Sequence, residues 1–340
     1  MNGRPPRIII AIAFMNLALA ASSACVRSLR EPPPLASLGG APAPAGAAAP
    51  AGPGVLARQD EVEALLARAE GSYAARTLED VRRAASIWLE AARADDRRVE
   101  GLVGAVRAQV WIADHEAAAK ARDEAATLAV QSAQWCGRIS ADNPACSFWL
   151  GAALGVQARE RRATALDALP KIVEAFQRAA DADPALEEAG PDRALAILYA
   201  RAPGWPTGPG DPDLSLAHAK KAVELRPDFP PNQLALAEAL RANGDREGSL
   251  KVYERSLELA RDFAAKGDRD AQEWVQEAEE ALRVRRDHQE GSSPPSRSRP
   301  PPERGGAPSR RAPSPHATPA RGAAPTPARR SPSRARVSPA

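Results

Sequence analysis

Residues 232–259 decide the fold, and they read NQLALAEALRANGDREGSLKVYERSLEL. Small and bulky apolar residues recur here at intervals of three or four positions, which is the spacing of one face of a helix. We expect two antiparallel helices that touch through these residues. Such a pair cannot bury its apolar face alone and must stack on similar pairs. The expected contact positions are Leu236, Ala237, Leu240, Gly244, Ser249, Tyr253, Ser256 and Leu259.

This spacing is similar to that of a tetratricopeptide repeat, in which a helix pair takes about 34 residues and a proline follows the second helix. Pro144, Pro184 and Pro227 occupy that place, and before each lie two residues three positions apart on one helix face. We therefore expect an all-α solenoid of stacked antiparallel helix pairs, with disordered N- and C-terminal segments. The residue pairs are Cys136 and Ile139, Phe176 and Ala179, and Ala219 and Ala222, and a weaker copy runs through Ala85, Leu89, Ala92, Val106 and Val110.

Composition divides the chain of 340 residues into unlike stretches. The last fifty residues hold ten Arg and one Glu, a net charge of +9 within a chain of net +3, so the rest carries −6. This Pro-, Ser- and Arg-rich tail lacks the apolar residues of a packed core, and we expect it to be disordered. It would attract anionic polymers, but it has no aromatic residues to stack on bases, so nucleic acid is not an expected partner.

The whole chain is expected to have four parts: a signal peptide (1–24), a Pro/Ala/Gly-rich tether (25–57), the helical domain (58–288) and the basic tail (289–340).

The N-terminal end has the order of a secretory signal. Arg4 and Arg7 precede an apolar run over residues 8–21, and small residues follow. Two cleavage sites fit: an A-x-A site at residues 18–20, and a lipobox over residues 22–25 in which Cys25 becomes the lipidated first residue. Serine stands where the lipobox usually has leucine. We expect export to the periplasm, with a lipid on Cys25 as the membrane anchor.

Cys136 and Cys146 flank a short turn almost symmetrically, and two interpretations stay open. They could pair across the end of a helical hairpin in an oxidising compartment. They could equally be two buried, unpaired small hydrophobes. A zinc site is not expected, because no second cysteine pair or nearby histidine completes four ligands.

A proline- and glycine-rich insertion over residues 202–212 separates two helical stretches, and we expect a compact loop there. It is not a phosphate-binding loop, because no Gly-Lys-Ser/Thr follows and its four prolines lack backbone donors. Trp205 in this loop either packs across neighbouring helices as a plug or lines a cleft and meets a ligand.

Three segments resemble the tetratricopeptide lipoproteins related to the T component of TRAP transporters (TatT). They are SFWLGAALG at 147–155, GPDRALAILYARAPGWP at 190–206 and PNQLALAE at 231–238, and the likeness covers roughly residues 60–285. The resemblance implies a membrane-tethered periplasmic protein with a concave groove. It also implies work beside a solute-binding protein in the uptake of small organic ligands. The spacer and the basic tail fall outside the pattern.

The first helix of each pair is expected to line the groove, which would hold a protein partner or a small organic ligand. Four of the six inward positions are arginines, so a carboxylate or an acidic peptide would suit them. The alternative is that these arginines form solvated ion pairs with neighbours such as Asp192, Glu160 and Glu238. With Trp205, the expected groove residues are Gln157, Arg161, Arg193, Arg201, Glu238 and Arg241.

No arrangement of side chains points to catalysis. The four histidines are scattered, and none has a nucleophile beside it in the sequence. We expect no enzyme activity, no cofactor and no metal. Two functions remain: a periplasmic accessory to solute uptake, or an envelope scaffold that binds a protein partner without a role in transport. A third hypothesis is adhesion to anionic polymers through the basic tail.

Overall fold

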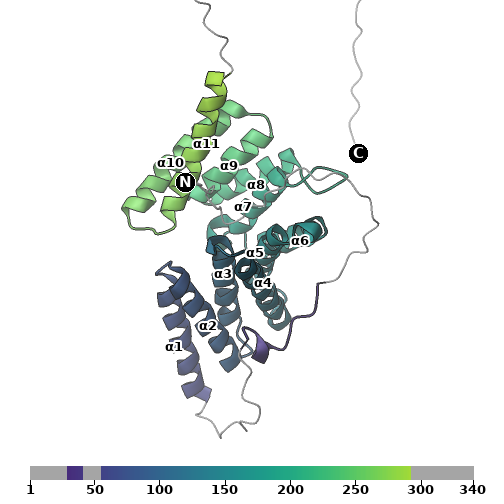
Figure 1. Ribbon diagram of the computed structural model, residues 1–340, viewed down its shortest axis with the longest axis vertical. Coiled ribbons are helices and arrows are strands. Elements are labelled where there is room, and N and C mark those ends of the chain that lie inside the picture. Colours follow the sequence, from purple (N-terminus) through teal and green to yellow (C-terminus); the bar gives the residue numbers. More distant parts are fainter. Residues whose placement is uncertain (1–28, 41–54, 292–340) are drawn as a thin grey trace, which may run out of the picture. The chain divides into compact units, whose positions relative to one another are not determined.

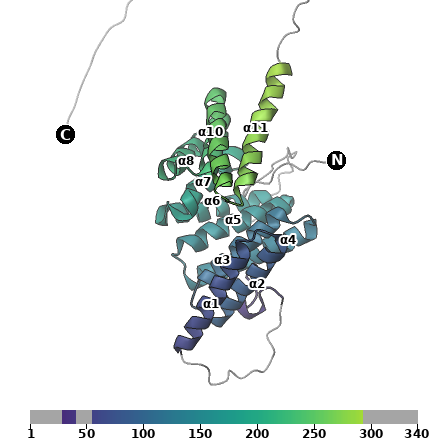
Figure 2. The ribbon, with the colours of Figure 1, turned by 90° about the vertical axis from the view of Figure 1, so that its left-hand side faces the viewer.

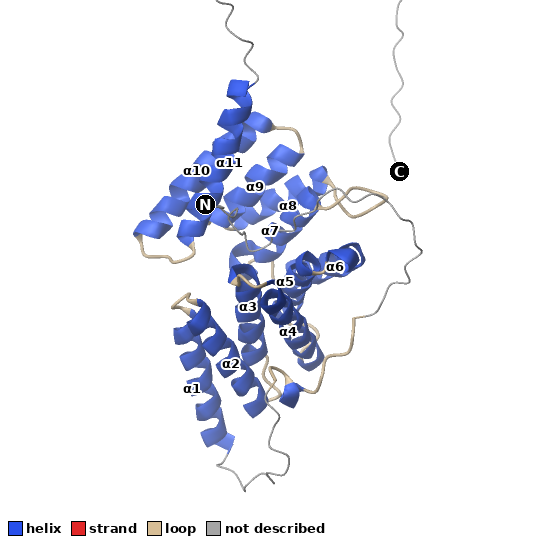
Figure 3. Ribbon diagram, viewed as in Figure 1, coloured by secondary structure: helices blue, strands red, loops and turns tan. Residues whose placement is uncertain are grey.

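The computed structural model describes residues 29–40 and 55–291, and these belong to one compact unit, Met1–Ser293. The expected signal peptide, Cys25 and the tail beyond residue 291 lie outside the described residues. Every regular element in the described ranges is helical (Figures 1 and 3), and none of these helices is both long and apolar enough to span a bilayer. The elements are η1 (Leu35–Ser37), α1 (Val55–Tyr73), α2 (Leu78–Ala94), α3 (Glu100–His115), α4 (Ala119–Ile139), α5 (Pro144–Glu160), η2 (Arg162–Thr164), α6 (Ala165–Ala182), α7 (Leu186–Arg201), α8 (Pro212–Leu225), α9 (Pro230–Ala242), α10 (Arg246–Ala265) and α11 (Ala271–Gly291).

Successive helices pack side by side, as α1 with α2 and α10 with α11 show in two views (Figures 1 and 2). The odd-numbered helices also contact one another in order, α1 with α3, α3 with α5, α5 with α7, α7 with α9 and α9 with α11. They form an inner row, and the even-numbered helices back them. This is the all-α solenoid of tetratricopeptide-like helix pairs that the sequence predicts.

Glycines allow the closest approaches within the pairs. A Cβ on Gly104 of α3 would lie 2.4 Å from the ring of Trp88 on α2, and a Cβ on Gly151 of α5 would lie 2.7 Å from the ring of Phe176 on α6. Because these rings are buried, they cannot move aside without disturbing the core. The small residues at these points therefore set the separation of the helices.

The turns before α5 and α8 are fixed by residues that lie within them. Asn143 caps α5 by accepting hydrogen bonds from two backbone N–H groups, and Asp211 caps α8 in the same way; a proline follows each cap at the first helical position.

Cys136 near the end of α4 and Cys146 in the first turn of α5 are bonded as a disulfide, with Cα atoms 5.3 Å apart. The disulfide agrees with the first interpretation of these cysteines, in which they pair across the end of a helical hairpin.

The insertion after α7 closes on itself. The N–H of Gly210 donates to the carbonyl of Pro203 at 2.8 Å, and a Cβ on Gly210 would lie 2.1 Å from the carbonyl oxygen of Ala202. Trp205, which is joined to Pro206 by a cis peptide bond, is 90% exposed. Both interpretations of Trp205, as a plug and as a cleft residue, are therefore wrong, because the loop is held by its own backbone and leaves the indole in solvent.

Residues 29–40 do not act as a tether. Leu38 is fully buried, and the indole N–H of Trp135 on α4 donates to the carbonyl of Pro33 at 2.7 Å. Arg138 of α4 forms an ion pair with Glu31 at 3.1 Å, and Arg93 of α2 donates to the carbonyl of Leu38. The expectation of a spacer over residues 25–57 is wrong for this part, because its few apolar residues and its carbonyls find partners on α2 and α4.

Candidate functional site

The inner row of helices lines a partly open cavity of about 240 Å³, which we call the inner pocket. Its walls come from the end of α1 and from α3, α5, α7, α9 and the start of α11. Ligand pockets of about 300–1,000 Å³ are usual, so this one suits a side chain or a small organic molecule. Its lining is Tyr73, Arg76, Arg107, Phe148, Trp149, Ala152, Glu187, Glu188, Gly190, Arg193, Ile197, Phe229, Pro231, Leu234, Ala235, Glu238, Asp270, Glu273, Trp274 and Glu277.

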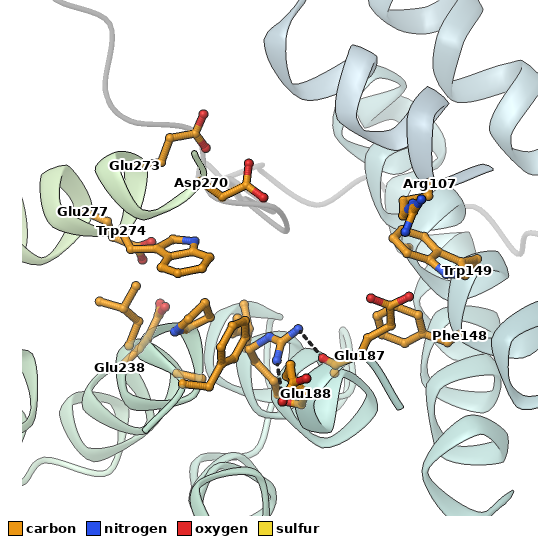
Figure 4. A pocket seen from close by; sticks show the side chains of 18 of the residues that line it. Arg107, Phe148, Trp149, Glu187, Glu188, Glu238, Asp270, Glu273, Trp274 and Glu277 are labelled. Carbon is orange, nitrogen blue, oxygen red and sulfur yellow. Dashed lines mark hydrogen bonds between the residues drawn. The ribbon is translucent and has the colours of Figure 1, made fainter. Parts of the chain in front are cut away.

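Aromatic rings form two opposite parts of this lining (Figure 4). On α5, Phe148 and Trp149 meet edge to face with ring centroids 5.1 Å apart. Phe229, which precedes α9, meets Trp274 of α11 edge to face at 5.3 Å. Such pairs hold each other in fixed orientations, so the apolar surface of the pocket is formed before anything binds.

The pocket lining carries six carboxylates and three arginines. Four of the carboxylates have basic partners: Asp270 pairs with Arg76, Glu188 with Arg226, and Glu238 with Arg201 and Arg241, while Glu273 lies 2.7 Å from the ring nitrogen of His115. Among the described residues, Glu187 and Glu277 form no ion pair. Glu187 therefore carries acidic charge without an ion pair, whereas burial raises the pKa of Glu277 to about 8 and leaves that carboxyl mostly protonated at neutral pH.

The three arginines of the lining are held by the protein itself. Arg76 makes two hydrogen bonds of 2.9 Å to Asp270. Arg107 pairs with Glu70 and lies 4.5 Å over the ring of Tyr73. Arg193 donates to Asn232 and to two backbone carbonyls. None of them is left to face an anionic ligand alone.

Arg193 stabilises an unusual turn at the start of α7. Glu187, Glu188 and Ala189 have φ values of 49°, 56° and 62°, the left-handed region that non-glycine residues rarely adopt in succession. The Arg193 guanidinium donates to the carbonyls of Glu188 at 3.0 Å and Glu187 at 3.2 Å, and Asn232 of α9 donates to Glu188 at 3.1 Å. Strained backbone of this kind persists where the surroundings hold it, and here it places two carboxylates on the pocket.

Contacts between distant parts of the chain join the first and last walls of the pocket. Besides the Arg76–Asp270 pair, Arg269 donates to the carbonyl of Ala75 at 2.8 Å. His115 at the end of α3 lies 2.7 Å from Glu273 of α11. The turn after α1 and the end of α3 are thus tied to the start of α11, although about 160 to 190 residues separate them in sequence.

Burial changes the acid–base behaviour of this region. Loss of solvent, aided by the nearby carboxylates of Glu238 and Glu273 and opposed by Arg201, raises the pKa of Glu277 to about 8. Tyr253 of α10 faces the same group, and burial raises its pKa. Burial alone would lower the pKa of His115, but its hydrogen bonds to Glu273 and to the Trp111 carbonyl outweigh this and raise it.

Burial also acts on the arginine that holds the α7 turn. Loss of solvent lowers the pKa of Arg193 to about 10, although the charges of Glu187 and Glu188 oppose the shift. Its guanidinium therefore depends on these carboxylates and carbonyls for its charged state. At neutral pH it remains a cation that is bound within the protein.

The structure brings only part of the expected groove together. Arg193 and Glu238 line the inner pocket, and Arg201 lies behind the lining, paired with Glu238 at 2.7 Å. Arg241 reaches the same carboxylate at 3.7 Å. The convergent arginine surface is therefore wrong, and the alternative of ion pairs with neighbours describes Arg201 and Arg241 correctly.

The other expected groove residues lie outside the pocket lining. Gln157 and Arg161 are at the end of α5, where Arg161 pairs with Asp123 of α4 at 2.6 Å. The positions predicted from the three middle repeats do not include the pocket residues on the first and last helices. Extending the same inward positions to the helices at residues 69–73 and 271–277 would have found Tyr73 and Glu277.

Comparisons with protein-family models and with curated protein sequences find no match for this chain. Among solved structures, a thermophilic TPR protein of Thermus thermophilus is similar, with 19% identity over 65% of this chain and 99% of that one, at a TM-score of 0.48. PilF of Pseudomonas aeruginosa has 14% identity over 70% and 95% of the two chains, at a TM-score of 0.44. YrrB, a TPR protein with an unusual peptide-binding site, has 17% identity over 60% and 92%, at a TM-score of 0.36.

Proposed function

We propose that this chain is an exported binding protein whose inner pocket holds a segment of a protein partner or a small organic ligand. The observation that carries the proposal is the construction of the pocket: every odd-numbered helix contributes to its wall, and long-range contacts tie the start of α11 to the turn after α1. Stacked helix pairs expose such an inner surface for recognition. We further propose that the protein is anchored in the periplasm through a lipid on Cys25 and assists solute uptake.

The side chains around the pocket support binding rather than chemistry. Most of its charged groups are engaged in contacts between helices, as His115 is with Glu273. The other described histidine with a carboxylate partner, His218, lies 2.7 Å from Asp192 and stacks on Tyr199. It joins α7 to α8 and does not line the pocket.

A photo-crosslinking experiment tests the pocket. Phe229, in the lining, is replaced by benzoylphenylalanine in the full-length protein, and the matched control carries the same residue at the exposed Trp205. After irradiation of cells, we expect a covalent adduct from position 229 and none from position 205. Mass spectrometry of the adduct distinguishes a protein partner, as a scaffold would have, from a small molecule. Adducts from position 205 alone, or equal yields from both positions, would refute the proposal.

The anchor is tested separately. Intact mass of the mature protein from the membrane fraction should show a diacylated residue at position 25, and Cys25→Ser should release the protein from membranes. A mature N-terminus at Ala21 would instead identify the A-x-A cleavage site and contradict the lipid anchor. This result would leave the pocket proposal unaffected.

A further inference from the structure

The chemistry of the pocket also indicates which class of ligand it takes, and this inference rests on the proposed binding function. Two carboxylates of the lining have no ion pair among the described residues. Glu187 is exposed in the left-handed turn of α7, with the charge of Arg193 nearby, and Glu277 is partly buried on α11. Glu187 is therefore a charged group at the pocket, whereas Glu277, whose pKa burial raises to about 8, holds a proton that it would release where a ligand brings a cation close to it.

Each of these carboxylates lies beside an aromatic ring. The Cβ atom of Glu187 and the ring of Phe148 both approach Gly190 of α7, since a Cβ on Gly190 would be 3.0 Å from each of them. Trp274 and Glu277 are three residues apart on α11, so they share one helix face, as Figure 4 shows. A cation that is drawn to either group would therefore also lie near an aromatic ring, and over the face of that ring it would gain a cation–π attraction.

A third feature points to a polar atom on the ligand. Trp149 belongs to the lining and is 7% exposed, and its indole Nε1–H is buried with no acceptor in the described part of the chain. Buried donors nearly always have a partner, so an orphan donor in a pocket wall indicates a place where an incoming acceptor is favourable. A carbonyl or hydroxyl oxygen on the ligand would supply it.

The pocket lining offers no comparable binding position for an anionic ligand. Arg76, Arg107 and Arg193 are all bound to groups of the protein, and an anionic ligand would have to break one of those contacts. It would also approach the charged carboxylate of Glu187, where like charges repel. We infer that the inner pocket binds a ligand with an ammonium or guanidinium group on an aromatic or otherwise apolar body. The cation would come from a free organic amine or from the Lys or Arg side chain of a peptide.

Isothermal titration calorimetry on the full-length protein tests this inference with matched probes. The small-molecule series is 2-phenylethylamine, its neutral counterpart 2-phenylethanol and the anion 3-phenylpropionate. The peptide series is acetyl-Phe-Arg-amide and the same peptide with citrulline, which keeps the shape of arginine without its charge. We expect the cationic member of at least one series to bind about tenfold or more tightly than its neutral counterpart. The series with the greater preference identifies the source of the cation.

Variants locate the charge that is recognised. Glu277→Gln and Glu187→Gln keep the side-chain shape, and at least one of them should remove most of the preference for the cation. Glu224→Gln removes an exposed carboxylate of α8 outside the pocket and should bind as the wild type does. Circular dichroism spectra show that each variant is folded.

The possible outcomes separate the two proposals. Equal or tighter binding of the neutral or anionic probes would overturn the charge inference and leave the pocket as a binding site. Binding of the amine that neither Gln variant weakens would overturn it too, because the cation would then be held elsewhere. If no probe binds at about 10 mM, a concentration that reveals even weak sites, the charge inference fails, while crosslinking from position 229 still decides the binding function.

Discussion

The ion pair between Arg76 and Asp270 should contribute measurably to stability, because it joins the turn after α1 to the residue before α11. Two hydrogen bonds of 2.9 Å connect the side chains, which are only 23% and 26% exposed. Exposed pairs are worth about 0.2–1 kcal/mol, and breaking a buried pair costs about 3–5 kcal/mol. For this intermediate burial we expect a coupling free energy of about 1.5 kcal/mol.

A double-mutant cycle isolates this coupling. Arg76 also donates to the Tyr73 carbonyl and lies 4.0 Å over its ring, so Arg76→Ala alone loses more than the ion pair. The cycle combines Arg76→Ala with Asp270→Ala and subtracts these other losses. Urea-induced unfolding at pH 7 gives the free energies, and hydrogen exchange shows whether α1 and α11 lose protection before the middle helices.

Two further measurements make the test more specific: the coupling of an exposed control pair, and a glycine substitution at Arg76. Arg255 and Glu258 form an exposed pair within α10 and should couple by no more than about 0.5 kcal/mol. A coupling between Arg76 and Asp270 as small as that of the control would refute the idea that this contact ties the two regions together. Arg76 has a φ of 55°, so Arg76→Gly should cost about 1 kcal/mol less than Arg76→Ala.

Two more predictions concern titration and packing. Because burial raises the pKa of Glu277 to about 8, the folded protein keeps a proton that the unfolded chain releases above about pH 4.5. The free energy of unfolding should therefore fall as pH rises from about 5 to 8, by up to about 1.4 kcal/mol per pH unit, and Glu277→Gln should remove this slope in urea titrations. Gly151→Ala should destabilise the protein by about 1–3 kcal/mol, because the new Cβ meets the ring of Phe176, whereas Gly155→Ala on the same helix has free space and should stabilise it slightly in thermal melts.

The fold follows from local signals in the sequence. The spacing in residues 232–259 predicts α9 and α10, and Asn143 and Asp211, each followed by a proline, mark where α5 and α8 begin. These signals suffice because a helix pair in a solenoid contacts mainly its neighbours. The left-handed turn at Glu187 carries no such signal, since residues far along the chain hold it in place.

The site depends on contacts that the repeat pattern does not contain. Arg193 and Glu238 could be found from the register of single repeats, but their partners could not. Arg201 has a short-range pattern typical of a groove residue, yet it is neutralised by Glu238 from the next pair. Asp270 enters the pocket only because the last helix returns to the first turn, and no periodicity in the sequence indicates that contact.

The docked segment at residues 29–40 would determine how the protein is oriented at a bilayer. Only three residues separate Cys25 from Leu29, so an acylated Cys25 would lie within roughly 14 Å of the docked chain. The Pro/Ala/Gly stretch at 41–54 comes after this segment and cannot lengthen that reach. The flank of α4 that carries Trp135 and Arg138 would then rest close to the lipid headgroups, with one fixed side of the solenoid turned toward them.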